Sequence, residues 1–172
     1  TQNEGNALTK LVDIILPKTD TLSASEVQVD IFIDKFAQDV MEKEQQDFFK
    51  MSMSNFMDKA LTDSGKENAE DLTSEDLEPV LASSLKYSKD QQTEMFESIN
   101  SYTEAIAEGK TSTLDDETTR FAFANNLRGM TIWGYKASEY VGEEVLAYLP
   151  VPGEYIPCGD MQELTGGKAW SL

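Results

Sequence analysis

The residue types that most often carry catalysis are scarce in this chain, which contains no histidine and only one cysteine, Cys158. Without histidine there is no imidazole metal ligand, no Ser–His or Cys–His nucleophile pair and no histidine proton relay. A single cysteine also excludes an internal disulfide and a CxxC redox pair. Any chemistry performed by the chain would therefore depend on carboxylates, lysines or tyrosines.

Carboxylates are abundant, but their arrangement does not indicate an active site. General acid–base catalysis needs a carboxyl pair that is desolvated in a pocket, whereas runs such as Asp115–Glu117 and Glu143–Glu144 are typical of solvated surface. The stretch Gly166–Lys168 lacks the rest of a phosphate loop, and the chain has no GxGxxG dinucleotide motif. We predict no catalytic residue, no cofactor-binding residue and no metal site. A carboxylate-based hydrolase, which would need a buried acid pair in a cleft, is the enzymatic alternative.

The charge balance limits the classes of partner. The 32 acidic and 14 basic residues give a formal net charge of −18. Proteins that bind nucleic acid backbones or anionic membrane surfaces need a basic face, so both are poor partners for this chain. We expect the acidity to serve mainly solubility, with a charge-steered partner as the alternative. No apolar run approaches the roughly 18 to 20 residues that a membrane-spanning helix needs.

The elements that must position any functional residue are helices, because apolar residues recur at helical spacing and nowhere alternate as in strands. Expected helices cover residues 8–15, 27–40, 44–64, 79–87, 89–108, 116–133 and 141–149. Ser88 with Gln91 has the form of a capping box, and Gly109 suits a helix end. The sequence predicts an all-α fold: a single domain of six or seven helices over residues 1–149, with an extended tail containing proline and glycine over residues 150–172.

Two groups of apolar side chains in these helices are expected to fill the core. One is the row in the second helix, which consists of Val29, Ile33, Phe36 and Val40. The other is the methionine cluster of the third helix, formed by Met51, Met53 and Met57. Because methionine adapts to many surfaces, a partner-binding role for the cluster is the alternative.

The most unusual residues lie between 118 and 158. Trp133, Gly134 and Tyr135 form a predicted Gly-aromatic corner that ends one helix. The only two arginines, Arg120 and Arg128, are eight residues apart and therefore roughly on one helical face. Either could hold a carboxylate through two hydrogen bonds. We favour an internal structural ion pair at Arg128 over a pair across an interface.

The tail that follows could be a recognition arm. Prolines at 150, 152 and 157 favour an extended backbone, which would lose little conformational entropy on binding a partner. Tyr148 and Tyr155 offer rigid contact surface. The residues alone equally allow a tail folded back over its own helices.

The spacing of these residues resembles the C-terminal half of the gluconate 2-dehydrogenase subunit 3 family. The residues that carry the resemblance are Phe123, Leu127, Arg128, Thr131, Gly134, Tyr135, Ser138, Glu139, Leu146, Tyr148, Pro150, Pro152, Gly153, Tyr155 and Cys158. The N-terminal stretch 8–36, with its proline break between two apolar helices, also resembles the opening of this family. The middle of the chain, 65–110, carries no such resemblance.

The resemblance implies a non-catalytic accessory subunit. Such subunits accompany membrane-associated, FAD-dependent sugar and sugar-acid dehydrogenases, whose large subunit holds the flavin and whose third subunit is a multihaem cytochrome c. It also implies that the chain binds and stabilises the large subunit, assists its maturation, and travels with it to the periplasm by twin-arginine export, the signal having preceded Thr1. A secreted, free-standing helical binding module is the alternative.

The same resemblance assigns the partner interface. We expect the contacts with the catalytic subunit to come from the aromatic residues of the C-terminal stretch and from the cysteine, namely Trp133, Tyr135, Tyr148, Tyr155 and Cys158. For Cys158 the resemblance implies a disulfide to the catalytic subunit. The cysteine count alone leaves open a buried thiol or an intermolecular bond.

Overall fold

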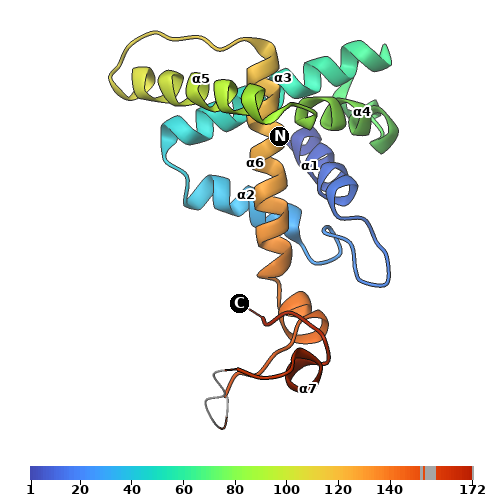
Figure 1. Cartoon of the computed structure of the whole chain (residues 1–172). Helices are drawn as coiled ribbons and strands as arrows, with labels where there is room; N and C mark the ends of the chain where they lie inside the picture. The colour runs from blue at the N-terminus through green and yellow to red at the C-terminus, as the bar shows by residue number, and fades with distance from the viewer. Residues whose placement is uncertain (152, 154–157, 172) are drawn as a thin grey trace.

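The computed structural model describes residues 1–151, 153 and 158–171 of the chain (Figure 1). Its α-helices are α1 (Gln2–Ile15), α2 (Val29–Asp39), α3 (Lys43–Ser64), α4 (Ser74–Leu85), α5 (Lys89–Ala107), α6 (Asp116–Lys136) and α7 (Met161–Thr165). A 3₁₀ helix, η1 (Ala69–Asp71), precedes α4, and a π-helix, η2 (Val141–Val145), follows α6. The described residues contain no β-strand, so the predicted all-α fold is confirmed.

Side-chain caps define where several helices begin. Thr73 caps α4 in a reciprocal box with Asp76, and Ser88 caps α5 in the predicted box with Gln91. The Asp115 carboxylate accepts the Thr118 backbone N–H at 2.8 Å at the start of α6. These caps satisfy N–H groups that have no partner within the helix.

Helix α6 is the central element. Helices α1 to α5 all contact it, and Figure 1 shows them grouped around its upper part while its lower end extends beyond them. The core is built on α6 residues Phe123, Leu127 and Met130. The Phe123 ring lies 5.6 Å from the Phe49 ring and 5.1 Å from the Phe56 ring, so α3 and α6 are held together by aromatic packing.

The predicted corner at Gly134 is wrong, because α6 continues through it to Lys136. Gly134 is buried against the Phe32 side chain of α2, and a Cβ placed there would lie 2.6 Å from Phe32 Cδ1. The glycine is therefore required for close approach of two helices, not for a change of chain direction.

Helix α4 also begins earlier than its proline suggests. Because proline suits the first turn of a helix, the sequence predicts a start at Pro79. The structure instead starts the helix at Ser74, after the cap at Thr73, and Pro79 lies on its exposed side. Leu72, which lies between the helices expected over 44–64 and 79–87, is only 1% exposed and belongs to the core.

The apolar row of α2 is buried for only part of its length. Val29 and Ile33 are buried, Phe36 is half-buried, and Val40 is 61% exposed, because the C-terminal end of α2 extends beyond the core. The methionine cluster of α3 divides in the same way. Met53 and Met57 fill the core, whereas Met51 faces outward.

Beyond α6 the chain forms a small body that we call the C-terminal lobe, comprising the described residues from 138 onward. The helix expected over 141–149 is limited to η2, because the backbone adopts an extended conformation at Leu146 (ψ 170°). The tail expected to be extended contains α7, capped by Asp160. Figure 1 shows the lobe below the main body, at the end of α6. None of the helices described is both long and apolar enough to cross a bilayer.

Candidate partner-binding surface

The C-terminal lobe is held together mainly by backbone and polar contacts. Ala147 N donates to Ala169 O at 2.8 Å, and Ser171 N donates to Ala147 O at 2.9 Å, which forms a bridge between the two ends of the lobe. Lys168 Nζ donates to the Glu144 carbonyl at 3.1 Å. Helix α7 contains no buried residue. The lobe therefore has very little core of its own.

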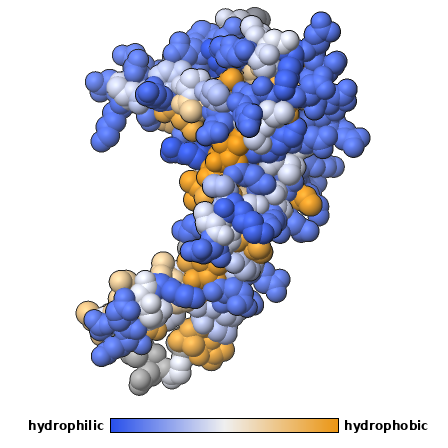
Figure 2. Space-filling model, turned by 90° about the vertical axis from the view of Figure 1, so that its right-hand side faces the viewer, coloured by the Kyte–Doolittle hydropathy of each residue, from blue (hydrophilic) through white to orange (hydrophobic). Residues whose placement is uncertain are grey.

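Apolar side chains that this small body cannot bury lie on its surface. Six of the twelve large hydrophobic residues that are exposed in the described part of the chain belong to the lobe: Tyr148, Leu149, Val151, Met161, Leu164 and Trp170. Figure 2 shows hydrophobic side chains on the lobe and in the neck that joins it to the main body. Concentrated exposed apolar surface is typical of a protein–protein contact.

Trp133 adds exposed apolar surface on α6. Its indole is 47% exposed, and its neighbour Ile132 is 42% exposed. The Trp133 ring packs nearly at right angles against the rings of Phe32 and Phe36. The ring centroids are 5.1 Å apart for Phe32 and 5.3 Å apart for Phe36. Packing on two α2 rings fixes the indole while leaving much of its face accessible, which is the arrangement of an interface anchor.

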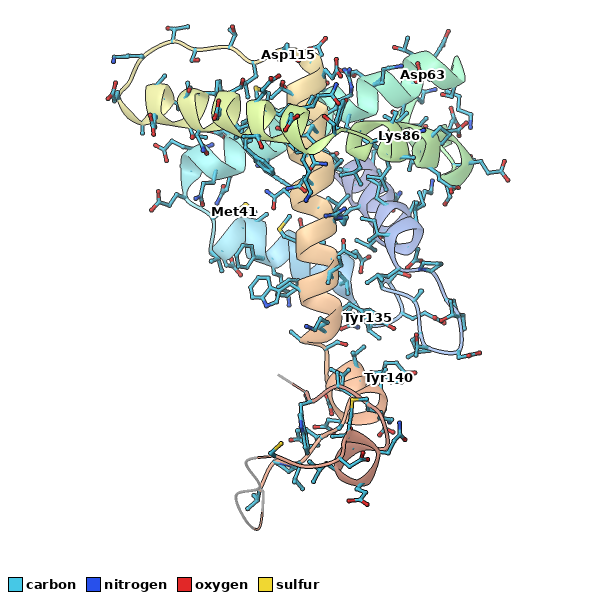
Figure 3. The ribbon with its side chains drawn as sticks, in the orientation of Figure 1. Met41, Asp63, Lys86, Asp115, Tyr135 and Tyr140 are labelled. Carbon is cyan, nitrogen blue, oxygen red and sulfur yellow. The ribbon has the colours of Figure 1, made fainter. Side chains whose placement is uncertain are left out.

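Tyr135, which the resemblance assigned to the interface, has partners within the chain. Its hydroxyl donates to the Leu22 carbonyl at 2.7 Å and lies 3.0 Å from Thr21 Oγ1, and its ring packs against the core. Figure 3 shows Tyr135 near the lower end of α6. Tyr135 therefore has a structural role: its hydrogen bonds hold the connection between α1 and α2 against α6.

The remaining predicted interface residues lie in the lobe. The Tyr148 side chain is 50% exposed, and Cys158 is an exposed free thiol. Tyr155 lies outside the described residues. The sequence analysis did not include Met161 and Trp170 among the interface residues, although both are exposed in the structure. Their apolar side chains in a segment too short to build a core could have indicated them.

Arg128 does not form the predicted ion pair within the part of the chain that the structure describes. Arg128 and Phe121 lie on the same side of α6, two turns apart. The rings of Tyr87 and Phe96 cover Phe121, with centroid distances of 5.8 and 5.2 Å, whereas Arg128 is exposed. The other arginine is used internally: Arg120 Nη1 donates to Asn55 Oδ1 at 3.2 Å and links α6 to α3.

Acidic residues in the described ranges do not gather into a buried site. The buried polar side chains there are all serine or threonine. Within the same ranges no cluster of three or more histidine, cysteine, aspartate or glutamate side chains could hold a metal ion. The hydrolase alternative therefore lacks, among the described residues, the desolvated acid pair that it needs.

Comparison with known proteins agrees with the resemblance over most of the chain. Residues 2–153 match the family described as Gluconate 2-dehydrogenase subunit 3. No curated protein and no solved structure matches the chain. The matched range covers α1 to α6 and the first part of the C-terminal lobe, which includes η2 and Tyr148, but it stops before Cys158 and α7. Since the match extends over most of the 172 residues, the chain belongs to the gluconate 2-dehydrogenase subunit 3 family.

Proposed function

We propose that this chain is the small, non-catalytic subunit of a flavin-dependent sugar or sugar-acid dehydrogenase, and that it binds the catalytic subunit through the C-terminal lobe and Trp133. Family membership supports the role of a dehydrogenase subunit. The observation that carries the binding surface is the exposed apolar lobe at the end of α6.

The geometry suits a permanent partner. Side chains such as Tyr148, Met161 and Trp170 are each half or more exposed, and water contact with so much apolar surface is unfavourable unless a partner covers it. Tyrosine and tryptophan are also the residues that most often dominate binding energy at interfaces. In this proposal the FAD of the catalytic subunit supplies the redox chemistry, and this chain supplies contacts that stabilise and help mature that subunit.

Export and further partners belong to the same proposal. The assembly would travel folded through the twin-arginine route to the periplasm, where a multihaem cytochrome c subunit could accept electrons from the flavin. Family membership supports the dehydrogenase complex to which these steps belong.

The test of the subunit role is copurification from the native host. The tagged chain should bring down, at a constant ratio, a larger protein that contains FAD and oxidises a sugar or sugar acid. The chain produced by itself should bind neither flavin nor haem, because it has no dinucleotide motif, no CxxCH and no histidine. Recovery of the chain without a flavoprotein would instead favour the free-standing binding module.

Cys158 carries a separate part of the proposal, a disulfide to a cysteine of the catalytic subunit. Its thiol is exposed, and in an oxidising compartment two thiols can lose two protons and two electrons to a thiol oxidant to form the bond. Non-reducing electrophoresis of the complex should show a band at the summed subunit mass that Cys158→Ser abolishes. Two separate bands from the wild-type complex would contradict the link and leave non-covalent binding untouched.

A further inference from the structure

A second apolar surface lies away from the lobe, in an open groove where the end of α2, the start of α3, the second half of α5 and α6 meet. We call it the α3–α5 groove. Its volume is about 1050 Å³, and its apolar wall is formed by Phe36, Met41, Phe48, Met51, Tyr102 and Ile106. Figure 3 shows Met41 at the connection between α2 and α3, on one side of this region.

The groove exists because α5 does not close over the start of α3. No residue of α5 is buried, and its apolar row, which includes Ile99, Tyr102 and Ile106, is only half-buried. The Phe48 and Tyr102 rings meet at 5.4 Å, and the Tyr102 hydroxyl lies 4.0 Å from Met51 Sδ. These contacts leave a flexible methionine and two aromatic rings accessible in the groove wall.

The groove has acidic lining residues and no basic one. Glu42, Glu44 and Asp47 line it, and all three are exposed. The basic residue between them, Lys43, is paired with Asp47 on the helix surface. An apolar wall with two further carboxylates beside it attracts a ligand that is both apolar and positively charged, and repels an acidic one.

We propose that the α3–α5 groove binds a basic amphipathic helix of a partner protein, with apolar side chains against Phe48, Met51 and Tyr102 and lysine or arginine side chains facing Glu42 and Glu44. Charge complementarity selects this occupant. A second copy of the chain, whose formal net charge is also −18, would be repelled. Methionine in a groove adapts to the apolar face of such a helix. The proposal does not depend on the lobe or on the dehydrogenase partner.

The probe is a synthetic amphipathic helix of leucine and lysine, about 18 residues or five turns long, compared with a peptide in which glutamate replaces every lysine. Trp133 reports binding, because its ring lies 5.3 Å from Phe36 in the groove wall. Trp170→Phe leaves Trp133 as the only tryptophan. The lysine peptide should change the fluorescence saturably and bind more weakly as salt rises, and the glutamate peptide should not bind.

Matched variants distinguish the groove from general acidity. Glu42→Lys with Glu44→Lys should weaken binding of the lysine peptide about tenfold. Glu70→Lys with Glu75→Lys makes the same change in net charge at exposed positions outside the groove lining, and Glu75, like Glu44, lies in the first turn of its helix. This control pair should change the affinity by less than about twofold.

A steric variant completes the test. Ala107→Phe adds a ring at an exposed position that lines the groove and should also weaken binding without changing net charge. Equal effects of the two charge-reversal pairs, equal binding of the two peptides, or no binding of the lysine peptide would overturn the proposal. Self-association of the free chain that Ala107→Phe abolishes would overturn it in favour of a second copy.

Discussion

Among single residues, Asp76 combines three hydrogen bonds at one carboxylate. Its carboxylate accepts hydrogen bonds from Lys66 Nζ at 2.6 Å, and from the Thr73 backbone N–H and hydroxyl, each at 2.7 Å. The bond from Lys66, followed by those from Thr73, lowers the pKa of Asp76 from its usual 3.8 to about 2. Because the folded state holds the ionised form, this carboxylate stabilises the fold above the usual pKa, and the stabilisation disappears as the pH falls through the folded value.

Replacing Asp76 tests this contribution. Asp76→Asn should lower the free energy of unfolding at neutral pH, and the difference from wild type should shrink as the pH falls from 3.8 toward about 2. Denaturant titrations at several pH values measure the difference. Asp58→Asn, an exposed aspartate on α3, is the matched control. If the difference in unfolding free energy between wild type and Asp76→Asn stays constant over this pH range, the ionised Asp76 carboxylate does not stabilise the fold as described.

Tyr135 shows what sequence reasoning cannot decide at this scale. A tyrosine near a predicted helix end suits an interface, but its hydroxyl bonds lead to Thr21 and Leu22, more than a hundred residues away in the chain. The same holds for Arg128, whose exposure depends on which helices cover α6. The types of both residues are evident from the sequence, whereas their surroundings depend on tertiary packing.

At the scale of elements, local signals predicted well. The periodic apolar residues and the cap at Ser88 place the end of α1 and both ends of α3 and α5 close to their observed positions, because helix starts and stops depend on neighbouring residues. The start of α1 was missed, because its cap at Thr1 lies well before Leu8, where the predicted helix begins. Two predictions that depended on proline or glycine alone failed, at Pro79 and Gly134, whereas Gly109 follows the end of α5 as predicted. The Thr73 cap determines the start of α4 despite Pro79, and the Phe32 ring explains Gly134.

Two glycines of α6 make a matched pair. Gly134→Ala should lower the free energy of unfolding by about 1–3 kcal/mol, because the new Cβ would meet the Phe32 ring, which is itself packed against Trp133. Gly129→Ala, exposed on the same helix with nothing within 4 Å of its Cβ, should raise it by about 0.5–1 kcal/mol. Chemical denaturation measures both. Equal stabilisation by the two substitutions would mean that α2 and α6 do not approach as closely as described.

At the scale of the whole molecule, a helical body carries two exposed apolar surfaces, the C-terminal lobe and the α3–α5 groove. The sequence predicts the all-α body and the family, but neither surface in full, because apolar residues such as Met51 and Ile106 have the spacing of core residues. Only the arrangement of α3 and α5 leaves them uncovered. The lobe was partly predictable, since its prolines and short length argue against a core.

The central claim is that the lobe binds the catalytic subunit, and the most direct measurement is the affinity of a lobe variant for the purified FAD-containing subunit. Tyr148→Ser, Met161→Ser and Trp170→Ser together replace side chains that are each half or more exposed, so the fold should persist. The dissociation constant should rise at least about a hundredfold.

The control replaces Val40 and Ile31 by serine, which are exposed apolar residues of the main body. It should leave the dissociation constant within about twofold of wild type. Reduced chains must be compared, so that a Cys158 disulfide does not hide the loss. If the lobe variant binds the flavoprotein as tightly as the control does, the lobe is not the binding surface and the account is contradicted.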